Sequence, residues 1–409
     1  MEVRKGYKQT EAGVIPEDWE VKPLCSVAAY TNGKAHEGCI SDLGKYIVVN
    51  SKFISTNGEV SKYSDYCFSP ASNGEILMVM SDVPNGRAIA RCFYVDRDNL
   101  YTVNQRICAL RPFQTDGRLL FYKLDRNPFY LSFDDGVKQT NLRKEDVLSC
   151  LLALPPTKAE QTAIAAALSD ADALIQSLEK LIAKKRNIKQ GAMQELLKPK
   201  EGWVVKKLGE IFSFSGGYTA SREQLSDDGY CYLHYGDIHG ATNTFIDVKS
   251  DYAEIPKLQI PLKKVSPRSL LNEGDIVFVD ASEDDEGTSR HIVVKNPDGA
   301  PYISGLHTIV AKSKDNAVNN DYKRYCFQSA YIKCQFKFYA VGTKVSGISK
   351  TNIAKIEISL PALDEQTRIA TILSDMDAEI SALETKLAKY KQIKQGMMQE
   401  LLTGKTRLV

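Results

Sequence analysis

The chain has 409 residues, with 53 Lys and Arg against 51 Asp and Glu, and its net charge of +2 is too small to indicate nucleic acid binding by itself. With 43% hydrophobic and 25% charged residues, it has the composition of a globular protein of about two to three domains. No apolar run reaches the ~18–20 residues that a membrane-spanning helix needs. Met1–Gly6 lack the apolar stretch of a signal peptide, so we expect a cytoplasmic protein without a membrane segment. The nine cysteines form no CxxC pair, which predicts free thiols.

Residues 1–155 are predicted to form a mainly β module. Runs rich in β-branched and aromatic residues, such as Lys45–Asn50 and Glu75–Met80, alternate with Gly, Asn, Asp and Pro turns. The turns hold side chains suited to DNA, since Arg and Lys bind phosphates and guanine while Asn and Gln pair with adenine. The candidate DNA-contacting residues of this module are Arg87, Asn104, Gln105, Arg106, Lys138 and Gln139. For any one of them, ordinary surface exposure is the alternative explanation.

Residues 156–198 are predicted to form a long helix. Leu154-Pro155 precedes Glu160-Gln161-Thr162, and a proline ahead of an acidic first turn is a helix-start signal. Apolar residues then recur at spacings of three and four, through Ile188 to Leu196, as in one face of a helix. About 38 residues at 1.5 Å each give a length of roughly 57 Å.

Residues 199–361 are predicted to form a second mainly β module. Its strand-like runs include Asp275–Asp280 and His307–Lys312. It repeats landmarks of the first module, because Trp203–Leu208 echoes Trp19–Leu24, but the sequences between such landmarks diverge almost completely. The candidate DNA-contacting residues of this module are Arg222, Ser289, Arg290, His307 and Lys344.

Residues 362–409 are predicted to form a second long helix that repeats the first. Pairing Glu160–Leu197 with the residues 205 positions later gives 24 identities in 38 positions, where unrelated sequences would give roughly two or three. The second copy continues the apolar spacing through Ile393. A helix this long needs a partner for its apolar seam, and the other copy can supply it, in a parallel or an antiparallel coiled coil.

The repeat keeps a glycine inside each helix, Gly191 and Gly396, where glycine costs about 1 kcal/mol relative to alanine. This indicates either close approach of the two helices or docking of another protein, and a simple bend is the alternative. The predicted subunit-docking residues are Gly191, Met193, Gly396 and Met398.

The sequence gives little support to a catalytic or metal site. Arg126–Phe129 lacks the second proline of an adenine methyltransferase motif, and Thr403–Thr406 lacks the upstream glycine of a phosphate-binding loop. The acidic run Ser282–Gly287 is interpreted as a solvated loop, and His234 and His239 as structural or loop histidines without zinc-spaced companions. We therefore expect no catalytic residue, no metal site and no cofactor.

Several stretches resemble a known family. They are Tyr7–Leu24 with its short echo Gly202–Leu208, the two Leu-Pro…Glu-Gln-Thr helix openings, and the closing Lys394–Leu408. Together they make the chain resemble the specificity (S) subunits of type I restriction–modification systems, over essentially its whole length.

The resemblance implies an α+β fold, in which two mainly β target recognition domains alternate with two long helices that pair as an antiparallel coiled coil with a pseudo-two-fold repeat. It implies a non-catalytic DNA sequence-specificity subunit, with each recognition domain reading one half of a bipartite, asymmetric site in double-stranded DNA. The paired helices would set the spacing and dock two methyltransferase (M) subunits, and restriction (R) subunits would join in the full complex.

Two other classes of protein make different predictions. A coiled-coil interaction protein with no DNA role predicts loops without combinations of Arg, Asn and Gln, whereas Asn104, Gln105 and Arg106 stand in succession. A self-contained restriction or modification enzyme predicts cofactor motifs, which we do not find in the sequence.

Overall fold

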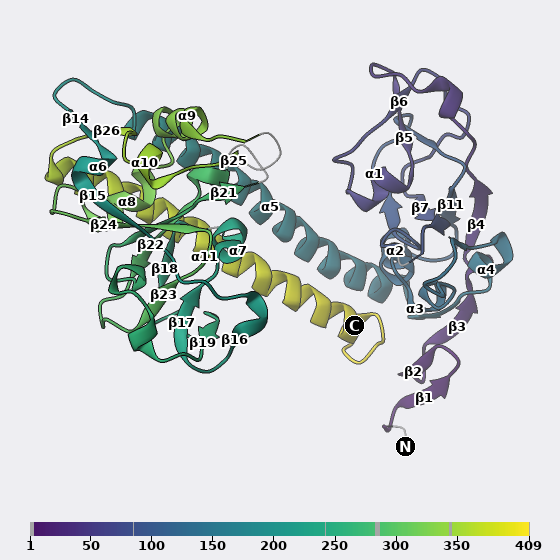
Figure 1. Cartoon of the computed structure of the whole chain (residues 1–409). Coiled ribbons are helices and arrows are strands. Elements are labelled where there is room, and N and C mark those ends of the chain that lie inside the picture. Colours follow the sequence, from purple (N-terminus) through teal and green to yellow (C-terminus); the bar gives the residue numbers. More distant parts are fainter. Residues whose placement is uncertain (1–3, 85, 242, 283–286, 343–345, 409) are drawn as a thin grey trace. The chain divides into compact units, whose positions relative to one another are not determined.

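The computed structural model describes residues 4–84, 86–241, 243–282, 287–342 and 346–408. The chain divides into two compact units, Met1–Glu179 with Thr385–Val409, and Lys180–Glu384. The division runs through the two long helices, α5 (Lys158–Leu196) and α11 (Leu363–Leu401), each of 39 residues (Figure 1). Each unit therefore contains one β-rich module and one half of each helix. The sequence instead predicts four consecutive segments, in which each long helix is separate from the β modules. That division remains a prediction.

The first unit is built on two small sheets. One is antiparallel, with the strand order β4 (Ala28–Asn32), β11 (Ile107–Pro112), β7 (Ile76–Val79), β9 (Cys92–Tyr94). The other has the order β10 (Tyr101–Val103), β5 (Tyr46–Val49), β6 (Tyr63–Ser64), with β10 parallel to β5. Three ladders join β1 (Tyr7–Thr10) to β2 (Gly13–Pro16), β3 (Glu20–Pro23) to β13 (Leu151–Leu154), and β8 (Ser81–Asp82) to β12 (Thr140–Asn141). The short helices are α1 (Ser51–Ser55), α2 (Gly117–Leu124), α3 (Pro128–Leu131) and α4 (Lys144–Leu148).

The second unit repeats this plan with additions. Its larger sheet has the order β15 (Phe212–Gly216), β24 (Thr308–Ser313), β20 (Ile276–Val279), β22 (His291–Lys295), β18 (Phe245–Asp247). Its smaller sheet has the order β16 (Leu225–Ser226), β19 (Lys257–Leu258), β17 (Tyr230–Leu233), β23 (Tyr302–Ser304). Two ladders join β14 (Val204–Lys207) to β26 (Glu357–Leu360) and β21 (Ala281–Ser282) to β25 (Ser346–Gly347). The short helices are α6 (Leu208–Ile211), α7 (Tyr235–Gly240), α8 (Asn320–Cys326), α9 (Ala330–Tyr339) and α10 (Lys350–Ile353).

One strand in each module is apolar on both faces because it separates two cores. In β7, Ile76 and Met78 belong to one core cluster while Leu77 and Val79 belong to another. Strand β20 divides its side chains between two clusters in the same way. Successive side chains of a strand point to opposite faces, so a continuous apolar run is what such a central position requires.

A buried glutamine anchors the first turn of each long helix to its module. Gln161 Oε1 accepts from Asp116 N (2.9 Å), and its Nε2 donates to Pro155 O (2.9 Å). Gln366, 205 residues later, accepts from Asn319 N (2.9 Å) and donates to Pro361 O (3.0 Å). The Pro–Glu-Gln-Thr signal that predicts the helix start therefore also supplies the contact that orients the helix.

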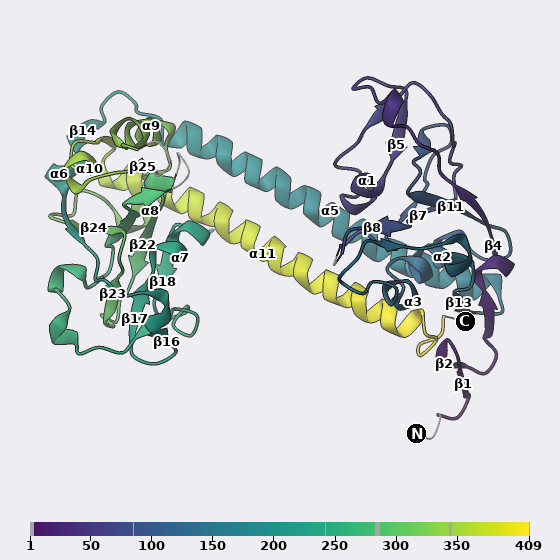
Figure 2. The same ribbon diagram turned by 45° about the vertical axis from the view of Figure 1, so that its right-hand side comes forward.

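The helix halves within each unit run antiparallel and are joined by matched ion pairs (Figure 2). The pairs are Asp172 with Lys394 (2.6 Å) and Glu179 with Lys391 (2.7 Å) in the first unit, and Asp377 with Lys189 and Glu384 with Arg186 (2.5 Å) in the second. Shifting either set by 205 positions gives the other. Such partly exposed pairs contribute only about 0–1 kcal/mol each, so their main effect is to fix the register.

A tyrosine fastens each module to its ion-paired helices. The Tyr122 hydroxyl donates to Asp172 (2.7 Å), and the Tyr325 hydroxyl donates to Asp377 (2.8 Å). Burial raises the pKa of both tyrosines, which keeps each hydroxyl protonated as a donor.

The predicted apolar seam is correct only in part. Ile175 and Ile182 are buried, but Ile188 and Ile393 are 46% and 43% exposed. The reason is that Lys189 and Lys394, the residues next to them, take the ion-paired positions toward the other helix.

The predicted close approach of the helices at their glycines is wrong, because a Cβ added at Gly191 or Gly396 would meet no atom within 4 Å. In the described ranges, no helix combines the length and the apolar character needed to cross a membrane.

Candidate nucleic-acid interface

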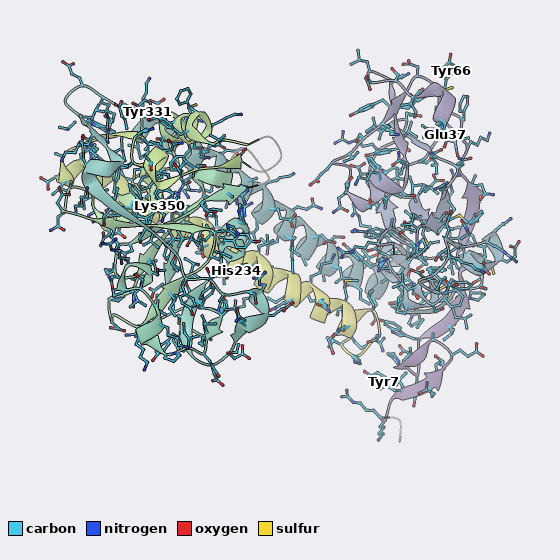
Figure 3. All side chains as sticks on the ribbon, viewed as in Figure 1. Tyr7, Glu37, Tyr66, His234, Tyr331 and Lys350 are labelled. Carbon is cyan, nitrogen blue, oxygen red and sulfur yellow. The ribbon has the colours of Figure 1, made fainter. Side chains whose placement is uncertain are left out.

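The turn between β10 and β11 presents three of the predicted residues of the first module. Asn104 forms the turn itself, because its Oδ1 accepts from Gln105 N (2.8 Å). Gln105 and Arg106 follow with exposed side chains, and Gln105 Nε2 donates to Glu37 Oε1 (2.9 Å). Figure 3 labels Glu37 on the first module.

Two further loops join this turn at the same edge. Arg106 O accepts from Met80 N (3.0 Å), and the neighbouring Ser81 accepts from Gln139 Nε2 (2.7 Å). Lys138 is exposed beside Gln139. The structure thus brings Arg106, Lys138 and Gln139 to one edge.

Asp82 holds the loop that carries Arg87 at the same edge of the module. The Asp82 carboxylate accepts from Ala88 N (2.6 Å) and Val83 N (2.9 Å), which holds the loop that carries the exposed Arg87. Asp82 pairs with Thr140 in the β8–β12 ladder, so the Arg87 loop lies beside the Gln139 loop.

In the second module the corresponding edge is organised around α7 and Tyr235. The Tyr235 ring lies 4.6 Å from His234, 5.5 Å from His307 and 6.2 Å from His239, measured between ring centroids. Burial lowers the pKa of His234, so its neutral imidazole can accept from Gly236 N at Nδ1 (3.1 Å) and cap the helix. His307 Nδ1 lies 3.3 Å from Asp280 Oδ1.

Two of the predicted arginines contact the same helix, α7. Arg222 pairs with Asp237 (2.6 Å), and Arg290 Nη1 donates to the carbonyl of His239 (2.6 Å). Ser289 is only 8% exposed and its neighbour Arg290 is exposed, so a DNA contact by Ser289 stays a prediction. Lys344 lies outside the described residues.

The two edges have an equivalent position directly before strands β11 and β24. His307 O accepts from Asp280 N (3.2 Å) just as Arg106 O accepts from Met80 N (3.0 Å). His307 precedes β24 and Arg106 precedes β11, and these strands pair antiparallel with the equivalent strands β20 and β7. One framework therefore presents an arginine in the first module and a histidine in the second.

The sequence analysis did not single out Tyr235. Its interpretation of His234 as a structural histidine agrees with the position of His234 as the N-cap of α7. The available signal was two histidines and a tyrosine within six residues, but their convergence with His307 depends on tertiary structure. Among the described residues, no three His, Cys, Asp or Glu side chains are grouped so that they could hold a metal ion.

A family model described as the type I restriction modification DNA specificity domain matches residues 16–187 and again residues 200–395. The chain belongs to this family. A specificity subunit named for the type I restriction enzyme MjaVIII of Methanocaldococcus jannaschii is 25% identical, over 99% of this chain and 96% of that protein.

Solved structures show the same fold. The type I restriction–modification S subunit from M. genitalium matches with a TM-score of 0.59 at 16% identity, over 98% of both chains. A chain from a structure of type I restriction–modification complex assembly matches with a TM-score of 0.53 at 15% identity, over 96% of this chain and 99% of that one.

The predicted family and the predicted fold class, two β-rich modules alternating with two long helices in an internal repeat, are confirmed. As a type I specificity subunit, the chain is a DNA-recognition component and not a catalytic one.

Proposed function

We propose that each module reads one half of a split, asymmetric DNA sequence, and that the paired helices fix the gap between the halves. The observation that carries the proposal is the equivalence of Arg106 and His307, two different side chains on one framework. A protein that read the same half-site twice would need the same chemistry at both edges. Different chemistry favours two different half-sites.

The exposed side chains of the two edges suit base and phosphate contacts. Arg106 can bind guanine in a bidentate manner, and Gln105 can pair with adenine once it leaves Glu37. Arg87 and Lys138 are exposed cations suited to phosphates. The proposed DNA-contacting residues are Arg87, Asn104, Gln105, Arg106, Lys138, Gln139, Arg222, Ser289, Arg290 and His307, with Tyr235 added and Lys344 retained from the sequence.

The helices have the length for a spacer. Each has 39 residues, roughly 58 Å at 1.5 Å per residue, while half-sites on one face of B-DNA lie about 34 Å apart per helical turn. A helix pair locked by ion pairs also fixes the rotational phase of the two modules, which a flexible linker could not do.

We further propose that two M subunits dock on the duplicated stretches, and that R subunits join the full complex. Ile188 and Ile393 support this, because the repeat keeps an exposed apolar residue at both positions next to the open glycines Gly191 and Gly396. Met193 and Met398, also predicted for docking, are half-buried and pack against the cores of their own units, so they suit a supporting role.

The test is co-expression of this chain with the methyltransferase subunit encoded beside it, followed by native mass spectrometry and methylation sequencing of the host DNA. We expect a complex with two M subunits and a split motif. Replacing Ile188 with Asp should remove one M subunit and replacing Ile393 with Asp the other, while both variants stay folded because these side chains are exposed. A complex that keeps both M subunits in the double variant contradicts the docking surface. A stable complex without any methylated motif contradicts the reading of DNA.

A further inference from the structure

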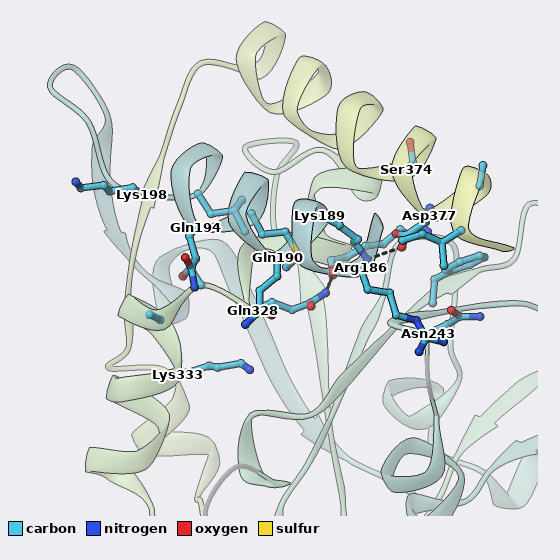
Figure 4. A pocket seen from close by; sticks show the side chains of 18 of the residues that line it. Arg186, Lys189, Gln190, Gln194, Lys198, Asn243, Gln328, Lys333, Ser374 and Asp377 are labelled. Atoms are coloured by element: carbon cyan, nitrogen blue, oxygen red, sulfur yellow. Dashed lines mark hydrogen bonds and ion pairs between the residues drawn. The ribbon is translucent and has the colours of Figure 1, made fainter. Parts of the chain in front are cut away.

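A groove with a volume of about 1080 Å³ lies within the second unit (Figure 4). Its walls are the last three turns of α5, the junction between α8 and α9, and the first half of α11. The α5 wall comes from the duplicated stretch, from Gln190 to Leu197.

The floor of the groove is apolar. Leu197 is buried, and Met193 and Phe245 are partly buried against the same core. At the rim, Tyr331 of α9 is 42% exposed. An apolar floor with an aromatic rim favours a protein side chain as occupant, since apolar anchors in pockets dominate protein–protein affinity.

The unpaired charges of the groove are positive. Its two carboxylates are already used, Asp377 by Lys189 and Glu384 by Arg186. Three further cations line the groove, and within the described ranges none has a carboxylate within 4.0 Å: Lys198, Arg324 and Lys333.

The guanidinium of Arg324 is positioned to bind an anion. Its guanidinium lies 3.8 Å from the centroid of the Phe245 ring, which fixes the side chain by stacking. Its Nε is buried and has no hydrogen-bond acceptor among the described residues. A buried donor without an acceptor is costly. A carboxylate that entered the groove and drew the guanidinium outward by a small side-chain shift would give Nε a charge-assisted hydrogen bond and relieve that cost.

We propose that this groove binds an acidic segment of the methyltransferase subunit, with one carboxylate on Arg324 and an apolar side chain over Met193 and Leu197. The inference rests on the proposed docking of that subunit. DNA is the less suitable occupant, because Arg324 lies half-buried inside the groove and the floor beside it is apolar, whereas the phosphates of a duplex are contacted at exposed cations.

Among the described residues of the first unit, the position equivalent to Arg324 carries no cation. Tyr122 and Tyr325 make the same bond in the two units, and the residue before each is Phe121 in the first and Arg324 in the second. The two duplicated surfaces therefore differ in chemistry, and the acidic segment is recognised in the second unit.

The experiment measures binding of the full chain to the co-encoded M subunit by sedimentation velocity over a dilution series at two salt concentrations. Arg324→Gln should weaken the second-unit M site about 30-fold, because it leaves the partner's carboxylate buried and unpaired. Lys333→Glu changes an exposed side chain and should weaken binding without affecting folding. Lys263→Glu is the matched control, since Lys263 is an exposed lysine of the same unit outside the groove, and it should bind like the unchanged chain.

A photocrosslinker identifies the occupant directly. With p-benzoylphenylalanine at position 331, irradiation of the complex on DNA should crosslink an M peptide rich in Asp and Glu. A crosslink to DNA, or an intact complex in which Arg324→Gln and Lys333→Glu bind as tightly as Lys263→Glu, overturns the groove proposal alone. Failure of the unchanged chain to bind M at all overturns the docking proposal on which it rests.

Discussion

Lys123 offers a direct test of how the end of α11 is held on the first module. Its side chain is 8% exposed, its Nζ donates to Leu402 O (2.6 Å), and its ammonium lies 4.9 Å from the Trp19 ring. Burial lowers the pKa of Lys123 from an ordinary 10.5 to about 7. The perturbation is Lys123→Met, which keeps a similar apolar stem and removes the titrating group.

The sign of the effect follows from proton binding. Between pH 7 and pH 10.5 the unfolded chain keeps the Lys123 proton while the folded chain has released it, so the stability of the folded chain rises with pH. The slope approaches about 1.4 kcal/mol per pH unit, which gives up to about 2.5 kcal/mol between pH 7 and pH 9. The Leu402 carbonyl and the Trp19 ring favour the ammonium and act against the shift, so we expect about 1–2.5 kcal/mol.

The assay is urea unfolding at pH 7 and pH 9, followed by tryptophan fluorescence. The chain has two tryptophans, so Trp203→Phe leaves Trp19 as a reporter of the first unit. The stability difference between Lys123→Met and the parent should favour the variant at pH 7 and shrink by about 1–2.5 kcal/mol at pH 9. A difference that stays constant with pH would refute the reasoning.

Three further predictions concern the glutamines that anchor the long helices, the loop edges proposed to read DNA, and the ion pair of Arg407. Gln161→Leu and Gln366→Leu should each destabilise only their own unit by about 3 kcal/mol, because each leaves buried backbone groups unpaired, and hydrogen exchange should show lost protection in that module alone. Arg106→Ala and His307→Ala should each reduce base specificity in one half of the methylated motif, at a cost of about 1–3 kcal/mol in discrimination between the correct and a wrong base. Methylation sequencing that showed both substitutions acting on the same half would contradict the proposal that each module reads one half. Arg407→Ala leaves the buried Glu160 without its bidentate partner (2.5 and 2.8 Å), and should cost about 3–5 kcal/mol in urea unfolding, whereas an unchanged midpoint would mean that this ion pair is not needed.

The helices and the repeat could be predicted because their signals are local. The Pro–Glu-Gln-Thr pattern marks helix starts, and α5 and α11 begin within a few residues of it, at Lys158 and Leu363. The function of Gln161 and Gln366 could not be predicted, because their partners Asp116 and Asn319 lie about 45 residues away in sequence and meet them only in the folded module.

In the apolar seam of the long helices, the spacing of apolar residues alone does not determine which side chains face the other helix. Ile188 fits the apolar spacing, yet Lys189 takes the position toward α11 because Asp377 is there to pair with it. An apolar pattern cannot reveal this, since it does not register charges on a helix that is distant in sequence.

The composition of the two loop edges proposed to read DNA was predictable from the sequence, but their arrangement was not. Asn104, Gln105 and Arg106 were predicted because Asn, Gln and Arg are the usual base-reading side chains. The equivalence of Arg106 and His307 was hidden because the modules diverge between their shared landmarks. Tyr235 was not singled out, because His307, one of the three histidines around its ring, comes from a loop that is distant in sequence.

The most direct test of the central claim exchanges residues 199–361 for the corresponding module of another family member and maps methylation by single-molecule sequencing of DNA from cells that also express the methyltransferase subunit. The account predicts a split, asymmetric motif with a fixed gap, of which the exchange changes one half and leaves the other half and the gap intact. A continuous motif, or an exchange that alters both halves, would contradict it.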